Sequence, residues 1–269
     1  MTGPPTDRVT EPQAASRVAA ILVAAGRGRR FGGSDNKVLQ LLEGQPIWLH
    51  SIRALRRCPR IGPVVMVIHP DDRGAVQDEA EGLGVRLVDG GRERVDSVLA
   101  GLKELEGMGH PAEPPDVTAE DVGSIADASR AGQLWVAIHD AARPLVPADD
   151  VDRVIEQAIL TGAAILATPV RGTIKLRSDS GDVTTVDRKR LWEALTPQVF
   201  REDILRTAYR RWRGRPVTDD AELVERSGFS ISLVPGSAEN LKITHAEDLI
   251  LAEAIMAKRQ RGREPRPDE

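Results

Sequence analysis

The sequence predicts an α/β protein built on a doubly wound, mostly parallel sheet. Two observations carry this prediction. Short apolar runs of strand length alternate along the chain with segments whose apolar residues recur at helical spacing. Runs such as PVVMVIH at 63–69 and LWVAIH at 134–139 are apolar without interruption, as expected for strands buried on both faces. In such a sheet, ligands bind beyond the carboxyl ends of the strands.

The first part of the chain follows this alternation after a short leader. Residues 1–16 are rich in proline, threonine and acidic residues, and we expect them to be disordered. The patterns predict strands at 17–24, 63–69 and 85–88, and helices at 46–58, 71–82 and 92–105. The last of these helices places Val95, Val98, Leu99, Leu102 and Leu105 on one face.

The second part contains an insertion and an arm. Residues 106–133 are too long and too polar for an ordinary connection, so we interpret them as a surface insertion. After it we expect strands at 134–139, 163–168 and 229–234 and helices at 149–160, 202–212, 220–227 and 245–258. Two β segments at 173–177 and 183–186 flank the turn SDSGD, which predicts a projecting hairpin arm at about 169–188. Thr244 and Glu247 fit a capping box for the last helix, and 259–269 form a charged tail.

Composition excludes several classes of function. The chain has 269 residues, of which 41% are hydrophobic, enough for a single large domain over 17–258. Its net charge of −4 gives no electrostatic reason to expect a nucleic-acid partner. No apolar run approaches the roughly 18 residues of a membrane span. The lone Cys58 excludes an intrachain disulfide and favours a reducing, cytoplasmic location.

A glycine-rich, cationic loop follows the first predicted strand. It contains Gly26, Gly28, Gly32 and Gly33 together with Arg27, Arg29, Arg30 and Lys37. Glycines let a ligand approach the backbone closely, and exposed N–H groups and guanidinium groups bind anions. The loop therefore predicts a triphosphate site, although a solvated surface loop would contain similar residues. It is neither a dinucleotide fingerprint, which Phe31 interrupts, nor a P-loop, where Ser34 replaces the lysine.

Asp140 ends a predicted buried strand and is a candidate metal ligand. A carboxylate opposite a triphosphate loop can bind Mg²⁺ that bridges phosphate oxygens, although a turn aspartate would have the same sequence context. Arg143 is close enough in sequence to bind a second anion, whereas His139 is expected to serve packing or a turn hydrogen bond. No Ser/His/Asp arrangement or zinc spacing is evident. If the nucleophile is a substrate phosphate, it is already ionised near neutral pH, and the reaction needs alignment and charge neutralisation but little proton transfer.

Six motifs, in order, make the chain resemble a known family. They are VAAGRGRRF with Lys37, VDGGRERVDSV, HDAARP, TVDRKRLWEALTPQVF, TDDA and NLKIT. Together they are similar to the motifs of 2-C-methyl-D-erythritol 4-phosphate cytidylyltransferases of the non-mevalonate isoprenoid pathway. The resemblance spans about 17–258 outside the insertion. It implies a Rossmann-like nucleotidyltransferase fold that joins CTP and 2-C-methyl-D-erythritol 4-phosphate, giving 4-diphosphocytidyl-2-C-methyl-D-erythritol and pyrophosphate.

The resemblance also implies roles for individual residues. Charge on the triphosphate would be neutralised by Arg30 and Lys37, and Ala24, Ala25, Gly26 and Gly28 would line the nucleotide loop. Gly91 and Ser97 would hold the cytidine, and Asp140 would contact Mg²⁺ and the substrate hydroxyls, with Arg143 nearby. The attacking phosphate would be positioned by Arg188 and Lys242 with Thr173, Thr196 and Thr218. In this family the arm reaches into the neighbouring subunit, which implies a homodimer with Thr173 and Arg188 serving the partner's site.

Three residues depart from the family pattern. Asn36 stands before Lys37 where proline is usual, Gly172 replaces a common aspartate, and Glu239 occupies a place often held by aspartate. Two alternatives stay open: a ribitol-5-phosphate cytidylyltransferase, which shares the chemistry, and a non-catalytic nucleotide-binding protein. The run TVDRKRLWEALTPQ favours the erythritol enzyme, and a binding protein would not need two phosphate sites. A fused cyclase domain is not expected, because few residues follow residue 260.

Overall fold

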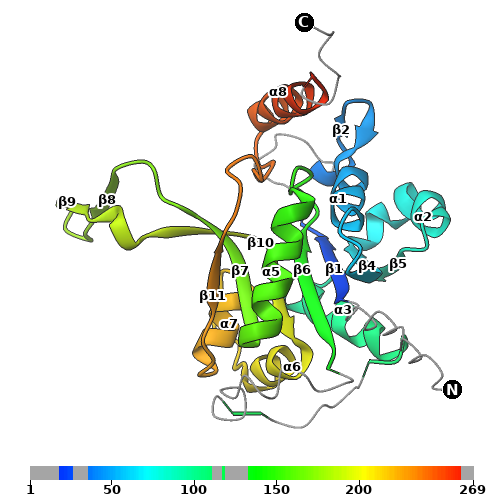
Figure 1. Ribbon diagram of the computed structural model, residues 1–269, viewed down its shortest axis with the longest axis horizontal. Coiled ribbons are helices and arrows are strands. Elements are labelled where there is room, and N and C mark those ends of the chain that lie inside the picture. Colours follow the sequence, from blue (N-terminus) through cyan, green and yellow to red (C-terminus); the bar gives the residue numbers. More distant parts are fainter. Residues whose placement is uncertain (1–17, 27–35, 111–116, 119–132, 262–269) are drawn as a thin grey trace, which may run out of the picture.

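A mostly parallel, seven-stranded sheet forms the centre of the molecule (Figure 1). The computed structural model describes residues 18–26, 36–110, 117–118 and 133–261. The leader, the loop residues Gly28 and Arg30, and most of the 106–133 insertion lie outside these ranges. The strands are β1 (Val18–Ala24), β4 (Ile61–Ile68), β5 (Arg86–Asp89), β6 (Trp135–Asp140), β7 (Ala163–Pro169), β10 (Trp192–Arg201) and β11 (Ser232–Pro235). Their order is β11-β7-β10-β6-β1-β4-β5, and β10 alone runs antiparallel to its neighbours in this sheet.

Helices cover both faces of the sheet, which confirms the doubly wound α/β class. One face packs against α1 (Ile47–Arg56), α2 (Arg73–Gly82) and α5 (Ala148–Thr161). The other packs against α3 (Arg94–Glu106), α6 (Glu202–Arg211) and α7 (Asp220–Arg226). Successive β1 side chains alternate between the two cores, as the two-residue period of a strand requires. Burying both faces explains the uninterrupted apolar runs in β4 and β6.

Strand β10 was not predicted from the sequence. Its run WEALTPQVFR contains Pro197, and proline argues against a central strand because it lacks a backbone N–H. The pairing with β7 shifts register between Ala194 and Gln198, and the pairing with β6 includes Gln198 to Arg201. Pro197 therefore lies at an irregularity in the ladder, where its missing donor is tolerated.

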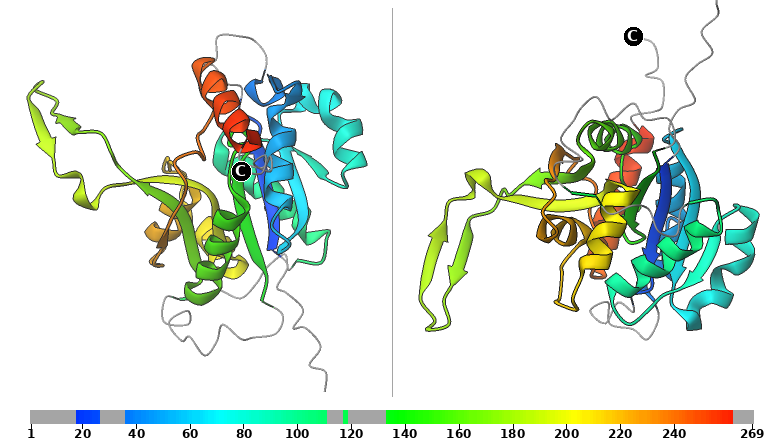
Figure 2. Two further views of the ribbon diagram at one scale, coloured as in Figure 1. Left: turned by 45° about the horizontal axis from the view of Figure 1, so that its top comes forward. Right: turned by 90° about the horizontal axis from the view of Figure 1, so that it is seen from below.

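The predicted hairpin projects from the body as an arm (Figures 1 and 2). Its strands are β8 (Ile174–Arg177) and β9 (Val183–Val186), which pair antiparallel with each other in a separate two-stranded sheet. The side chains of Leu176 and Val183 are exposed, at 61% and 60%. The arm therefore presents apolar residues that the described part of the chain does not cover.

Local details differ from the sequence predictions. Leu99 was expected on the buried face of α3 but is 39% exposed, whereas Val95 and Val98 are buried as predicted. The last helix, α8 (Glu247–Arg261), extends into the predicted tail. The predicted partner Glu247 does not cap this helix; instead Asp248 accepts hydrogen bonds from the N–H groups of Thr244 and His245, at 2.7 and 2.8 Å.

Two further observations concern segments outside the main sheet. Val117, within the predicted surface insertion, is buried against the core cluster that contains α3 and α6. A short hairpin missed by the sequence prediction, β2 (Leu41–Leu42) and β3 (Gln45–Pro46), follows the 3-10 helix η1 (Lys37–Leu39). In the described residues, no helix is both long and apolar enough to cross a membrane.

Candidate active site

The ends of β1, β5 and β6 meet at one edge of the sheet, as the sequence predicted. They border a cavity of about 180 Å³. Its lining includes Ala24, Ala25, Gly26, Lys37, Gly91, Ser97, Asp140 and Lys242. Eight of the residues that the family resemblance assigns to the site are thus brought together from five separate stretches of the sequence.

Asn36 holds the end of the cationic loop against β1. This residue is 2% exposed, and its side-chain amide donates to the carbonyl oxygen of Ala24 at 2.7 Å and to Asp72 Oδ2 at 3.0 Å. Its Oδ1 atom accepts a hydrogen bond from the N–H of Val38, which caps η1. These bonds fix the backbone on both sides of Lys37. The side chain of Asn36 therefore provides the restraint that a proline ring would otherwise supply at this position.

Two glycines in the turn after β5 permit close contacts, Gly90 with the loop after β1 and Gly91 with the start of α3. A Cβ atom on Gly90 would lie 2.3 Å from the Cβ of Ala25, and one on Gly91 would lie 2.2 Å from the Cβ of Asp96. Neither distance is compatible with a side chain. Ser97 follows in the first turn of α3, where its hydroxyl donates to the carbonyl oxygen of Glu93 at 3.2 Å. The glycines thus let the start of α3 and the loop after β1 form one wall of the cavity.

Asp140 is the centre of a cationic cluster. Lys242 Nζ lies 2.7 Å from its Oδ2, Arg143 Nε 3.7 Å from the same oxygen, and Arg94 Nη2 3.8 Å from Oδ1. Burial alone would raise the pKa of Asp140, but the three cations outweigh it and hold the pKa well below its usual range. The carboxylate therefore stays ionised at any pH at which the protein is expected to function.

A chain of hydrogen bonds supports Asp140 from behind. The backbone N–H of Asp140 donates to Thr196 Oγ1 at 3.1 Å, Thr196 Oγ1 lies 3.0 Å from His139 Nδ1, and His139 Nε2 lies 3.1 Å from the carbonyl oxygen of Arg143. A carbonyl only accepts, so Nε2 carries the proton; Nδ1 of the neutral ring then accepts from the Thr196 hydroxyl. His139 is fully buried and has no contact with the cavity. The prediction that it serves packing or a turn hydrogen bond agrees with the bond between His139 and the carbonyl oxygen of Arg143.

This arrangement predicts a pH dependence of stability. Burial lowers the pKa of His139 from 6.5 to about 4, although nearby Asp140 acts in the opposite direction. The unfolded chain therefore binds a proton between these values that the folded protein does not, and stability falls as the pH is lowered from 6.5 to 4. We expect this residue to contribute a loss of about 3 kcal/mol in the free energy of unfolding.

Denaturant unfolding at pH 7 and pH 4.5 measures this contribution. His139→Gln removes the titrating group, so the difference between the two pH values should be smaller in the variant than in the parent protein. An identical pH dependence in both proteins would contradict the assignment of a buried, neutral His139.

A second cavity of about 720 Å³ adjoins the first and shares Lys242 with it. Its lining includes Arg143, Arg171, Gly172, Glu193 and Thr244. The N–H of Ile243 donates to the carbonyl oxygen of Ala142 at 2.8 Å, which anchors the segment carrying Lys242 beside the turn after β6. Lys242 consequently lies at the boundary between the two cavities, with 41% of its side chain exposed.

Four other residues that the resemblance assigned to the site, Thr173, Thr196, Thr218 and Arg188, are not among the lining residues of the two cavities. The hydroxyl of Thr196 is occupied by the hydrogen bonds described above. Thr218 bonds to Glu222 through both its N–H and its hydroxyl, at 2.6 and 2.8 Å, before α7. Thr173 and Arg188 lie at the two ends of the arm, and Arg188 donates to the carbonyl oxygen of Arg171. Gly28 and Arg30 lie outside the described residues.

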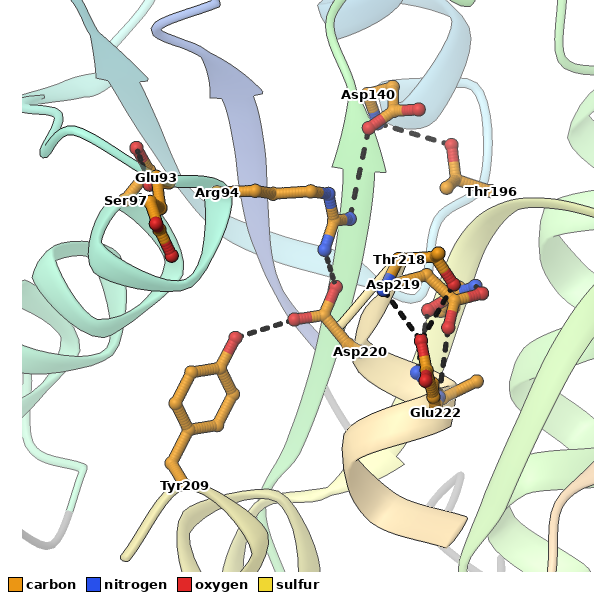
Figure 3. A network of polar contacts seen from close by, with 12 residues as sticks. Glu93, Arg94, Ser97, Asp140, Thr196, Tyr209, Thr218, Asp219, Asp220 and Glu222 are labelled. Carbon is orange, nitrogen blue, oxygen red and sulfur yellow. Dashed lines mark hydrogen bonds and ion pairs between the residues drawn. The ribbon is translucent and has the colours of Figure 1, made fainter. Parts of the chain in front are cut away.

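Arg94 borders the first cavity and was not predicted to do so. It forms ion pairs with Asp140 and with the buried Asp220 (Figure 3). Its motif, VDGGRERVDSV, was recognised, but only Gly91 and Ser97 were selected from it. The only local signal was weak: a cation at the N-terminus of a helix is disfavoured by the helix dipole, so a partner elsewhere would stabilise it. Glu239, in contrast, pairs with Lys258 and Arg259 outside both cavities.

The fold and the site together define the class of protein. The sheet is mostly parallel, and glycine-rich turns and a lysine lie at the ends of its strands. They face one ionised carboxylate that is surrounded by cations. This arrangement is typical of a nucleotidyltransferase. The model of the 2-C-methyl-D-erythritol 4-phosphate cytidylyltransferase family matches residues 18–112 and 116–258. The chain belongs to this family.

Individual relatives agree with the family match. The enzyme of this name from Rhodopirellula baltica is 44% identical over 246 residues, which cover 90% of this chain and 96% of the relative. Among solved structures, 4-diphosphocytidyl-2C-methyl-D-erythritol synthase from Anaerococcus prevotii aligns with a TM-score of 0.71 and 26% identity, over 90% of this chain and 99% of that one. The cytidylyltransferase from Thermus thermophilus aligns with a TM-score of 0.68 and 29% identity, over 90% of this chain and 99% of that one.

Proposed function

We propose that this chain joins CTP and 2-C-methyl-D-erythritol 4-phosphate, with release of pyrophosphate. The observation that carries the proposal is the position of Lys242 at the boundary of two cavities. One cavity is lined by the nucleotide-loop residues and the other by Arg143 and Arg171. CTP occupies the first and the sugar phosphate the second. Lys242 then contacts the attacking phosphate beside the α-phosphorus of CTP.

In this mechanism the substrate phosphate attacks the α-phosphorus in line, and pyrophosphate leaves. The phosphate is ionised near neutral pH, so no general base is required. Lys37, with Arg30 from the loop, stabilises the charge that grows on the triphosphate, and Lys242 orients the nucleophile. Arg143 and Arg171 line the second cavity, and their positive charges support anion binding there.

The donor set fits Mg²⁺ held mainly by substrate. No cluster of three or more His, Cys, Asp or Glu side chains able to hold a metal occurs in the described ranges. Mg²⁺ keeps several waters and commonly uses one or two carboxylates together with substrate phosphates. Asp140, ionised and bordering the first cavity, supplies one such carboxylate. When bound, the ion would neutralise phosphate charge, and Asp140 would also contact hydroxyl groups of the bound substrates.

The exposed arm supports a homodimer. Leu176 and Val183 are apolar and uncovered in the described part of the chain, and Arg188 and Thr173 are not among the lining residues of either cavity of their own chain. In a dimer, an arm that reaches the second cavity of the partner brings both residues to the sugar phosphate. The chain has one cysteine, Cys58, which is buried and free, and this supports a cytoplasmic location.

Substrate replacement tests the proposed reaction. Pyrophosphate release is measured with CTP and Mg²⁺ in the presence of either 2-C-methyl-D-erythritol 4-phosphate or ribitol 5-phosphate, and again with UTP in place of CTP. Release with the first pair alone is the expected result. Release with ribitol 5-phosphate alone would retain the chemistry but reject the substrate, and no release with any pair would favour the non-catalytic nucleotide-binding alternative.

A further inference from the structure

A buried carboxylate, Asp220, connects three helices near the candidate active site. It is 1% exposed at the start of α7. Its Oδ1 accepts a hydrogen bond from the Tyr209 hydroxyl of α6 at 2.6 Å, and its Oδ2 pairs with Arg94 Nη1 of α3. Figure 3 shows the Arg94 side chain extending between Asp220 and Asp140. Asp220 borders neither of the two substrate cavities.

The cations around Asp140 differ in their access to substrate. Lys242 makes the shortest contact, but it borders both cavities, so an incoming phosphate competes with Asp140 for it. Arg143 borders the second cavity and meets the same competitor. Arg94 is held from the opposite side by a carboxylate that substrate does not reach. Arg143 also donates to the carbonyl oxygen of Asn240 at 2.8 Å, but in the described residues Arg94 alone of the three forms an ion pair with a second carboxylate, and that carboxylate borders neither cavity.

The negative charge of Asp220 determines the direction in which the Arg94 side chain points. An arginine bordering a triphosphate site would otherwise turn towards the phosphates, because Arg–phosphate pairs are strong and bidentate. The Asp220 carboxylate retains one end of the guanidinium group, and the other end then faces Asp140 Oδ1 at 3.8 Å. The Tyr209 hydroxyl, buried with Asp220, occupies the remaining carboxylate oxygen and fixes its plane.

We propose that Asp220 and Tyr209 are positioning residues that hold Arg94 against Asp140. They keep this carboxylate in place while Lys242 transfers from it to the attacking phosphate. This inference rests on the proposed function, since it assigns a role within that reaction. It also explains why α3, α6 and α7 converge on one buried acidic residue at the nucleotide end of the site.

Asp220→Asn tests the proposal with little change in shape. The amide oxygen can still accept from Arg94 and the amide nitrogen can donate to the Tyr209 oxygen, but the negative charge that retains the guanidinium group is lost. Loss of a residue that orients a functional side chain in this way typically lowers activity by about 10-fold to 100-fold. We expect kcat to fall by at least about 10-fold. The KM for CTP and the metal-free affinity for CTP, measured by calorimetry, should each change by less than about threefold.

Tyr209→Phe removes only the hydroxyl and should lower kcat in the same direction, by a smaller factor. Because this substitution keeps the ring in the core, it remains informative if Asp220→Asn does not fold. The proposal would be overturned if kcat is unchanged in Tyr209→Phe and Asp220→Asn either has an unchanged kcat or does not fold. It would also be overturned if weaker CTP binding alone accounts for the whole loss of kcat/KM.

A comparable link between the same helices provides the matched control. Arg206 on α6 pairs with Glu106 at the end of α3 at 2.9 Å and donates to the carbonyl oxygen of Leu102 at 2.8 Å, away from Asp140. Glu106→Gln should lower thermal stability while kcat stays within about twofold of the parent value. An equal loss of kcat in this control would show that any loosening of α3 suffices, which would also reject the specific role of Asp220. An inactive parent protein would instead reject the proposed function itself.

Discussion

Alanine in place of Lys37 lowers turnover by about 100-fold or more in the mechanism proposed above. The loss corresponds to removing one preorganised charge from a site where negative charge develops on the triphosphate. Asn36 fixes the backbone beside this lysine, so the side chain begins from a defined position at the cavity. Steady-state measurement of kcat and kcat/KM with CTP and the sugar phosphate provides the test.

A second lysine supplies the control for this prediction. Lys258 on α8 has 73% of its side chain exposed and pairs with Glu239 outside both cavities. Lys258→Ala removes the same charge from the chain and should leave turnover within about twofold of the parent, as expected for a distant surface change. Near-normal turnover in Lys37→Ala would contradict the assignment of the nucleotide loop.

Mixing two inactive variants restores activity if the arm completes the partner's site. Arg188→Ala and Lys37→Ala each disable one component, and each homodimer should lose about 100-fold in turnover. In a mixed dimer, one site combines the intact Lys37 of one subunit with the intact Arg188 of the other. Random exchange of equal amounts should therefore recover about a quarter of the parent activity, given a symmetric dimer.

Purified heterodimers carrying two different tags make this measurement unambiguous. They should have about half of the parent activity per dimer, because one of the two sites is intact. As the control, Lys242→Ala mixed with Lys37→Ala should recover little, because both residues border the same cavity of one chain. Absence of recovery in verified Arg188/Lys37 heterodimers would indicate that each site is completed within one subunit.

The sequence predicted those strands and helices in which buried and exposed positions follow one regular pattern. Strands β4 and β6 are buried on both faces, so their residues are apolar throughout, and α3 and α5 each have one buried face with helical spacing. The convergence of the loop after β1 with Gly91 and Asp140 followed from the topology, because parallel strands end at the same edge. Strand β10 could not be found in this way, since Pro197 contradicts the usual composition of a central strand.

The sequence did not predict those contacts in the site whose two residues are far apart along the chain. Arg94 resembles any solvated arginine until its two partners, Asp140 and Asp220, are known, and these lie 46 and 126 residues further along the chain. Thr196 was assigned by resemblance to substrate, whereas its hydroxyl bonds to His139 and to the backbone of Asp140. Such contacts depend on which loops meet in three dimensions, and local spacing carries no information about them.

The stereochemical course at the α-phosphorus distinguishes one displacement from two. The proposed mechanism requires one in-line displacement by the substrate phosphate, without a covalent enzyme intermediate. A CTP analogue with a single configuration at a sulfur-substituted α-phosphorus is allowed to react with 2-C-methyl-D-erythritol 4-phosphate, and the configuration of the product is determined. Inversion is the predicted result. Retention would require two successive displacements and an enzyme nucleophile, and would contradict the mechanism.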